Sequence, residues 1–241
     1  MSSESTRLVR ASVVAVLSVA AVGCQEKVKY HPRPAVSGMK ASMPAVPNVP
    51  QKPLKAGGDW TVWGASFTLR SRVHHAEINT KKITVTGYIG KTNLPDAPEC
   101  AVHKGGKADP EGCKAPVPTF WLCDQKGDKI EDCIKVMGWA SNFAQIYDAI
   151  EKYDKEKDKD PADQEPYKDT FWGLELPRPI PNTGAKVTVE GTYTTTFTGA
   201  STGTAADPIM GILTYKNIKY LEPPPELAIL PGMEEKKKKG G

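Results

Sequence analysis

Five cysteines are the residues of this chain whose chemistry depends most on their partners. They are Cys24, Cys100, Cys113, Cys123 and Cys133. Cysteine pairs form disulfides in oxidising compartments, whereas a thiolate beside an imidazole can bind a soft metal ion. One imidazole is close in sequence, because His103 follows Cys100 by three residues. The residues around each cysteine decide between these two kinds of chemistry.

Cys24 stands apart because it ends a short apolar segment. Arg7 and Arg10 lead into the apolar residues 11–22, a run of 12, whereas a membrane-spanning helix needs about 20. Residues 21–24 read Ala-Val-Gly-Cys and resemble the lipobox of bacterial lipoproteins. The resemblance implies cleavage before Cys24, a diacylglyceryl group on its thiol and a further acyl chain such as palmitate on its amino group. An ordinary signal peptide that contains a cysteine is the alternative.

The expected location follows from that resemblance. Two or more acyl chains give stable membrane anchoring. Gln25, not aspartate, follows Cys24, so the enterobacterial rule for retention in the inner membrane does not apply. We therefore expect a bacterial cell-envelope lipoprotein, held at the outer membrane and facing the periplasm or the cell surface.

Four cysteines remain besides Cys24, and export would place them in an oxidising compartment. An even number of cysteines there favours two disulfides. Three pairings are possible. Neighbours in sequence are the natural pairs, namely Cys100 with Cys113 and Cys123 with Cys133. The first pair would close a proline-rich insertion at residues 91–118.

A metal site is the alternative use of the same residues. Cys100, His103 and Cys113 would together offer sulfur and imidazole to copper or zinc. His74 and His75 are expected on a strand, where adjacent side chains point to opposite faces, so one of them at most would join the site. The chain has no Cys-x-x-Cys spacing. The sequence accordingly predicts no cofactor, and metal binding is kept as the alternative.

No catalytic motif occurs in the context that its chemistry requires. The spacing Gly-x-Ser-x-Gly occurs at residues 199–203, but no helix is expected after it, as a nucleophile elbow requires. The residues Gly-Lys-Thr at 90–92 lack the glycine five positions earlier that a phosphate-binding loop requires, and there is no His-Glu-x-x-His pair. The chain is therefore not expected to be an enzyme. Its formal net charge is +4, part of which comes from the lysines at 236–239, so nucleic-acid binding is not expected either.

Alternating and β-branched segments predict the elements that would position these residues. One helix is expected at 143–153, because apolar side chains recur there every three or four residues. Asn142 with Gln145 resembles a capping box at its start, and Ser141 is the competing cap. Strands are expected at residues 60–69, 83–89, 120–123, 134–139, 187–193 and 212–220.

After the first of these strands, the order is three strands, a helix and two strands, which resembles an OB-fold. The segments 82–87 and 186–191 nearly repeat each other, and the first and fourth strands of an OB barrel are neighbours. The expected fold is mainly β: a small OB-like Greek-key barrel with one helix between strands 3 and 4. An open β-sandwich is the competing architecture.

The chain divides by composition into four parts. Residues 1–23 are the expected signal peptide and 24–58 a proline-rich tether without regular structure. Residues 59–221 form the expected barrel domain, and 222–241 are a disordered tail rich in proline and lysine.

Exposed aromatic side chains are the remaining candidate for function. OB barrels use such residues on strands 2 and 3 for stacking, so Trp121 and Trp139 on the expected hairpin are the candidate binding face. The alternative is that they belong to the core or lie beneath the insertion. We expect a lipid-anchored, non-catalytic binding or scaffolding module whose partner is an envelope protein, a peptide or a carbohydrate.

Overall fold

The structure is a computed structural model that describes residues 31, 52–160, 163–199 and 203–233. The chain divides between Val49 and Pro50, and all described residues except His31 belong to the second part. Cys24, the expected signal peptide and most of the expected tether lie outside the described residues, as do residues 234–241 of the expected tail.

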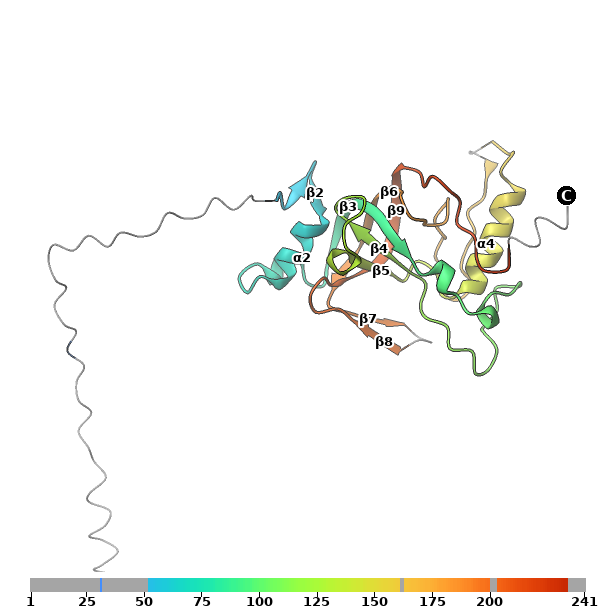
Figure 1. Cartoon of the computed structure of the whole chain (residues 1–241), viewed down its shortest axis with the longest axis horizontal. Helices are drawn as coiled ribbons and strands as arrows, with labels where there is room; N and C mark the ends of the chain where they lie inside the picture. Colours follow the sequence, from blue (N-terminus) through green and yellow to red (C-terminus); the bar gives the residue numbers. More distant parts are fainter. Residues whose placement is uncertain (1–30, 32–51, 161–162, 200–202, 234–241) are drawn as a thin grey trace, which may run out of the picture. The chain divides into compact units, whose positions relative to one another are not determined.

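Five strands close into a barrel (Figure 1). They follow the order β3-β4-β5-β9-β6, and β6 pairs back onto β3. Only the β5–β9 pair among these five is parallel. This is the strand order of an OB-type Greek-key barrel, so the predicted fold class is confirmed. The strands are β3 (Lys81–Thr92), β4 (Thr119–Cys123), β5 (Ile134–Met137), β6 (Lys186–Thr194) and β9 (Ile212–Glu222).

Period-two alternation explains the barrel wall. On β3 the side chains of Ile83, Val85 and Ile89 are buried, while Thr84, Thr86 and Tyr88 between them are half-exposed. The two similar segments noted in the sequence are antiparallel neighbours, with Val85 opposite Val189. Gly191 lies where the pairing of β6 with β9 shifts register, and a Cβ there would come 2.3 Å from the Thr214 carbonyl oxygen. A glycine is therefore required for this close strand contact.

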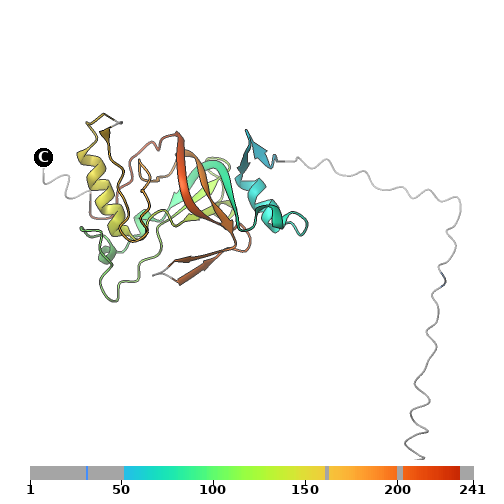
Figure 2. The same ribbon diagram turned by 180° about the vertical axis from the view of Figure 1, so that it is seen from behind.

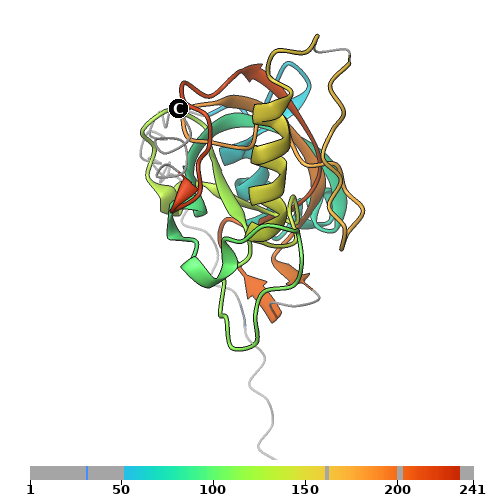
Figure 3. The same ribbon diagram turned by 90° about the vertical axis from the view of Figure 1, so that its right-hand side faces the viewer.

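The helix α4 (Phe143–Lys155) follows β5 as predicted. The Asn142 side chain accepts a hydrogen bond from the Gln145 amide at 2.9 Å, which confirms Asn142 as the cap. In the view from the side on which α4 lies, the helix crosses in front of the barrel (Figure 3). Its buried face includes Phe143, Ile146 and Ile150.

The prediction of a strand at residues 60–69 is wrong. Strands β1 (Lys55–Ala56) and β2 (Asp59–Thr61) are short, and β2 leads into the helix α2 (Val62–Arg70). The Thr61 hydroxyl accepts from the Gly64 amide, and the Asp124 carboxylate accepts from the Val62 and Trp63 amides at 2.8 Å each. These bonds satisfy the free amides of the first turn and fix the helix start.

His74 and His75 are not on a strand, which corrects the expectation for them. His74 precedes and His75 begins the short helix α3 (His75–Ile78).

The views from the front and from behind place α2 and α4 on opposite sides of the barrel (Figures 1 and 2). Among the described residues, no helix is long and apolar enough to cross a membrane.

Shorter elements complete the described chain. β7 (Thr196–Gly199) and β8 (Gly203–Ala206) form a separate two-stranded sheet. Three 3₁₀ turns lie in the connections, at Leu94–Asp96, Glu99–Ala101 and Ile130–Asp132.

The packed region also extends beyond the expected boundaries. β1 lies inside the expected tether, and Ala228, Leu230 and Met233 are buried in the main core although the tail was expected to begin at residue 222. The prolines at 223–225 indicated an unstructured segment, but the apolar residues after them pack against the domain.

Candidate binding surface

Trp121 lies on the outer face of the barrel between two lysines. Phe120 and Leu122 point into the core, so Trp121 points outward, where it is half-exposed. Its direct cross-strand partners are Lys91 on β3 and Lys135 on β5. The Lys91 ammonium lies 5.5 Å from the centre of the indole ring, within cation–π range. The ring thus has a lysine opposite it on each neighbouring strand, and the Lys91 ammonium lies over its face.

Tyr88 extends this surface along β3. The ammonium groups of Lys126 and Lys186 lie 5.1 and 5.2 Å from its ring centre. Tyr88 was not among the predicted binding residues, although it alternates with the buried Val85 and Ile89 and so had to face outward. We call these residues together the aromatic–lysine surface: Tyr88, Lys91, Trp121, Lys126, Lys135 and Lys186.

Each lysine of this surface is paired with a nearby carboxylate. Lys135 lies 3.3 Å from Asp207, and Lys126 and Lys186 lie 3.6 and 3.9 Å from Glu222. The pairs of Lys126 and Lys186 with the 50% exposed Glu222 contribute little free energy in water. An anionic group can therefore replace the Glu222 carboxylate at small cost, while the rings offer flat apolar contact.

Trp139 does not belong to the binding face, which corrects the prediction. Its side chain is 0% exposed and packs against Phe120 with ring centres 6.2 Å apart. The expected strand at 134–139 ends earlier, because β5 stops at Met137 and Gly138 has a φ of 82°. That left-handed residue breaks the alternation and directs the next side chain into the core.

The four remaining cysteines form the two predicted disulfides, Cys100–Cys113 and Cys123–Cys133. The second joins the end of β4 to the loop before β5 and lies beside the aromatic–lysine surface. The first closes the insertion, as expected.

The disulfide at Cys100 and Cys113 removes the two thiolates that the metal alternative requires. The nearest charged partner of His103 is Asp109, with 3.6 Å between Nε2 and Oδ1. Burial raises the pKa of the Asp109 carboxyl above its ordinary value, although His103 opposes this shift. Within the described ranges, no group of three or more His, Cys, Asp or Glu residues is arranged to hold a metal ion.

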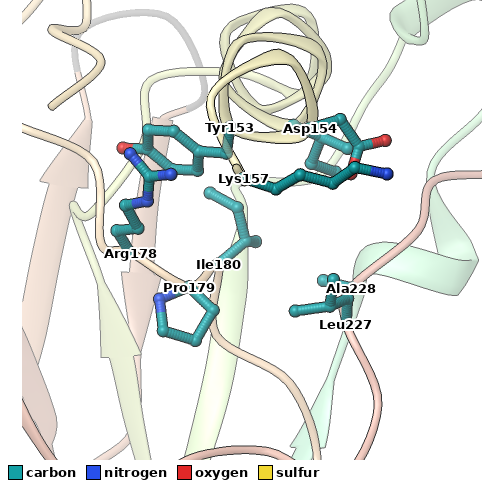
Figure 4. Close-up of a pocket in the computed structure, with 9 residues that line it drawn as sticks. Tyr153, Asp154, Lys157, Arg178, Pro179, Ile180, Leu227 and Ala228 are labelled. Atoms are coloured by element: carbon teal, nitrogen blue, oxygen red, sulfur yellow. The ribbon is translucent and has the colours of Figure 1, made fainter. Parts of the chain in front are cut away.

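A small cavity of about 180 Å³ opens beside the last turn of α4 (Figure 4). Ile180, Pro179 and Leu227 form apolar walls, and Arg178 lies over the Tyr153 ring at 4.7 Å. Small-molecule sites usually enclose roughly 300–1,000 Å³. The cavity suits a small apolar group and is not part of the aromatic–lysine surface.

Two comparisons with known proteins give no relative: no family model matches the chain, and no curated protein matches it. Among solved structures, the chain is similar to those titled "OBody AM1L10 bound to hen egg-white lysozyme" and "OBody AM3L09 bound to hen egg-white lysozyme". The identities are 11% and 10%, each match covers 61% of this chain and 85% or 86% of the other, and both TM-scores are 0.25. The class of the protein, a disulfide-bonded OB-like barrel, follows from its own strand order.

Proposed function

We propose that this protein is a lipid-anchored lipoprotein of the bacterial cell envelope and acts as a non-catalytic binding or scaffolding module. The lipobox-like residues 21–24, after a short basic and apolar segment, support the anchor at Cys24. Two disulfides are typical of a domain that folds in an oxidising compartment. An outer-membrane location, on the periplasmic side or the cell surface, remains part of this proposal.

The observation that carries the binding role is Trp121, a half-exposed indole with a lysine directly opposite it on each neighbouring strand. Such a platform stacks on flat apolar faces, and its ammonium groups attract anions. The favoured ligand is an envelope protein, peptide or carbohydrate that presents a flat apolar face next to a negative charge.

Intact mass tests the anchor. The chain is expressed in a bacterium that processes lipoproteins, and the product is expected to begin at Cys24 and to carry diacylglyceryl and an additional acyl chain. Cys24→Ser should yield no acylated product. A wild-type product that is cleaved elsewhere, or that carries no lipid, would contradict the anchor.

Equilibrium binding to isolated envelope fractions tests the surface. The probes are peptidoglycan with its attached glycans and the solubilised envelope proteins, each tested separately against the folded chain. Trp121→Ala and Lys91→Ala are expected to weaken saturable binding about tenfold or more. Phe171→Ala is the matched control, because Phe171 is 52% exposed and lies outside the aromatic–lysine surface. Equal binding by all three variants and the wild type would refute the role of this surface.

A further inference from the structure

The helix α2 presents an aromatic face that the barrel does not use. Val62, Ala65 and Leu69 turn into the core, whereas Phe67 is 44% exposed. The rings of Trp63 and Phe67, one helical turn apart, stack with centres 4.9 Å apart. Buried contacts thus fix the helix while the stacked pair remains accessible to solvent.

The strand β1 adds to the same region of the surface. The backbone of Leu54 lies directly on the first turn of α2, since a Cβ at Gly64 would come 2.0 Å from the Leu54 carbonyl oxygen. The Leu54 side chain is 42% exposed, and the Lys55 ammonium lies 4.4 Å from the ring centre of Trp60. We call Leu54, Lys55, Trp60, Trp63, Phe67 and Arg70 the α2 face.

Basic side chains dominate the surroundings of this face. Residues 52–78 contain four, Lys52, Lys55, Arg70 and Arg72, against two acidic ones, Asp59 and Glu77. Asp59 accepts from the Thr86 hydroxyl at 3.1 Å, and Glu77 contacts His74 at 2.6 Å. A third carboxylate, Asp124, accepts from the first two amides of α2. Four basic side chains against these three carboxylates leave a positive net charge.

The position of the face in the chain indicates what would cover it. Only 27 residues, 25–51, separate Cys24 from the first residue of the packed region, Lys52. Even as a fully extended polyproline-type segment at about 3.1 Å per residue, they reach roughly 85 Å. A lipid anchor at Cys24 would keep the α2 face within that distance of a bilayer, so that even a weak affinity for lipid suffices.

We propose that the α2 face docks on an anionic lipid surface, with Trp63 and Phe67 in the headgroup region and the basic side chains against lipid phosphates. Tryptophan prefers the membrane–water interface, and lysine and arginine side chains near an anionic surface are attracted to it. The geometry rests on the proposed anchor at Cys24. The docking places the barrel close to the membrane with the opposite side, where α4 lies, directed away from it.

Vesicle binding of a chain without its lipid tests this docking separately from the anchor. The chain carries Cys24→Ser, begins at that position and keeps all later residues. It is mixed with vesicles of phosphatidylglycerol and phosphatidylethanolamine, or of phosphatidylcholine alone. We expect sedimentation with the anionic vesicles, little with the neutral ones, and weakening as salt concentration rises.

Two variants locate the contact, and a third serves as the control. Phe67→Ser, and separately Arg70→Glu with Arg72→Glu, should each lower binding to the anionic vesicles about tenfold. Phe171→Ser is the matched control, since it removes a similarly exposed aromatic ring elsewhere and should bind like the parent chain. Circular dichroism spectra identical to those of the parent establish that each variant is folded.

Two outcomes would overturn the proposal. One is absence of binding to the anionic vesicles, or binding that the Phe67 and arginine variants retain in full. The other is a dimer in solution that Phe67→Ser dissociates, which would assign the α2 face to a second copy of the chain. A chain found without lipid at Cys24 would instead refute the anchor, whatever the vesicles show.

Discussion

At the scale of single residues, Asp169 ties two segments of the chain together. Its carboxylate is 0% exposed and accepts from the amides of Ser141 and Phe171 at 2.8 Å each and of Trp172 at 3.0 Å. Asp169→Ala would leave these amides unpaired, so we expect a loss of about 3 kcal/mol in the free energy of unfolding, measured with urea. The exposed Asp158→Ala should change it by less than about 0.5 kcal/mol.

Tyr167 makes the free energy of unfolding depend on pH in the alkaline range. Burial, with help from the nearby charges of Asp148 and Asp169, raises the pKa of its phenol from 10.0 to about 12. Between these two values the unfolded chain loses a proton that the folded chain keeps, so the free energy of unfolding falls as pH rises. Tyr167→Phe should make this fall less steep in urea titrations at successive pH values. An unchanged slope would mean that Tyr167 does not contribute.

Gln145 shows which contacts the local sequence pattern predicts and which it does not. The sequence predicted Asn142 as the helix cap, and the bond to the Gln145 amide confirms it. The Gln145 side chain, however, does not return to the cap. It donates to the Gly106 carbonyl and accepts from the Tyr167 hydroxyl at 3.0 Å, contacts to residues 39 and 22 positions away. Local spacing predicts a cap, but such long-range partners depend on the completed fold.

At the scale of elements, the two disulfides differ in how well the fold shields them from solvent and reductant. Cys123 and Cys133 are 0% and 2% exposed, whereas Cys100 is exposed at the surface of the insertion. A mild reductant followed by alkylation should therefore label Cys100 and Cys113 first, as measured by peptide mass. Full reduction of the buried pair should require partial unfolding. Equal labelling of all four at low reductant concentration would contradict this order.

The same scale explains which elements could be predicted. The barrel strands and α4 carry their periodicity within a few residues, so the sequence predicted their type and order. The start of α2 depends in part on Asp124, 62 residues away from Val62, which accepts from its first two amides, and the segment at 60–69 also alternates like a strand. Trp139 was misplaced because a single left-handed glycine, Gly138, reverses the expected face.

At the scale of the whole molecule, the main core includes a segment that the composition assigned to a tail. After β9 the described part of the chain continues to Met233, and Leu230 is 1% exposed within the main core. The prolines at 223–225 carry no signal of this packing, because it comes from contacts with distant residues. The domain therefore has a C-terminal part that the sequence alone did not define.

Leu230→Ala tests this contribution. Removal of a buried leucine side chain leaves a cavity, so we expect the free energy of unfolding to fall by about 2–4 kcal/mol. Leu227→Ala is the matched control, since Leu227 lies three residues earlier and is 65% exposed. It should change stability by less than about 0.5 kcal/mol. Equal midpoints for the two variants in urea would show that the Leu230 side chain adds nothing to the stability of the core.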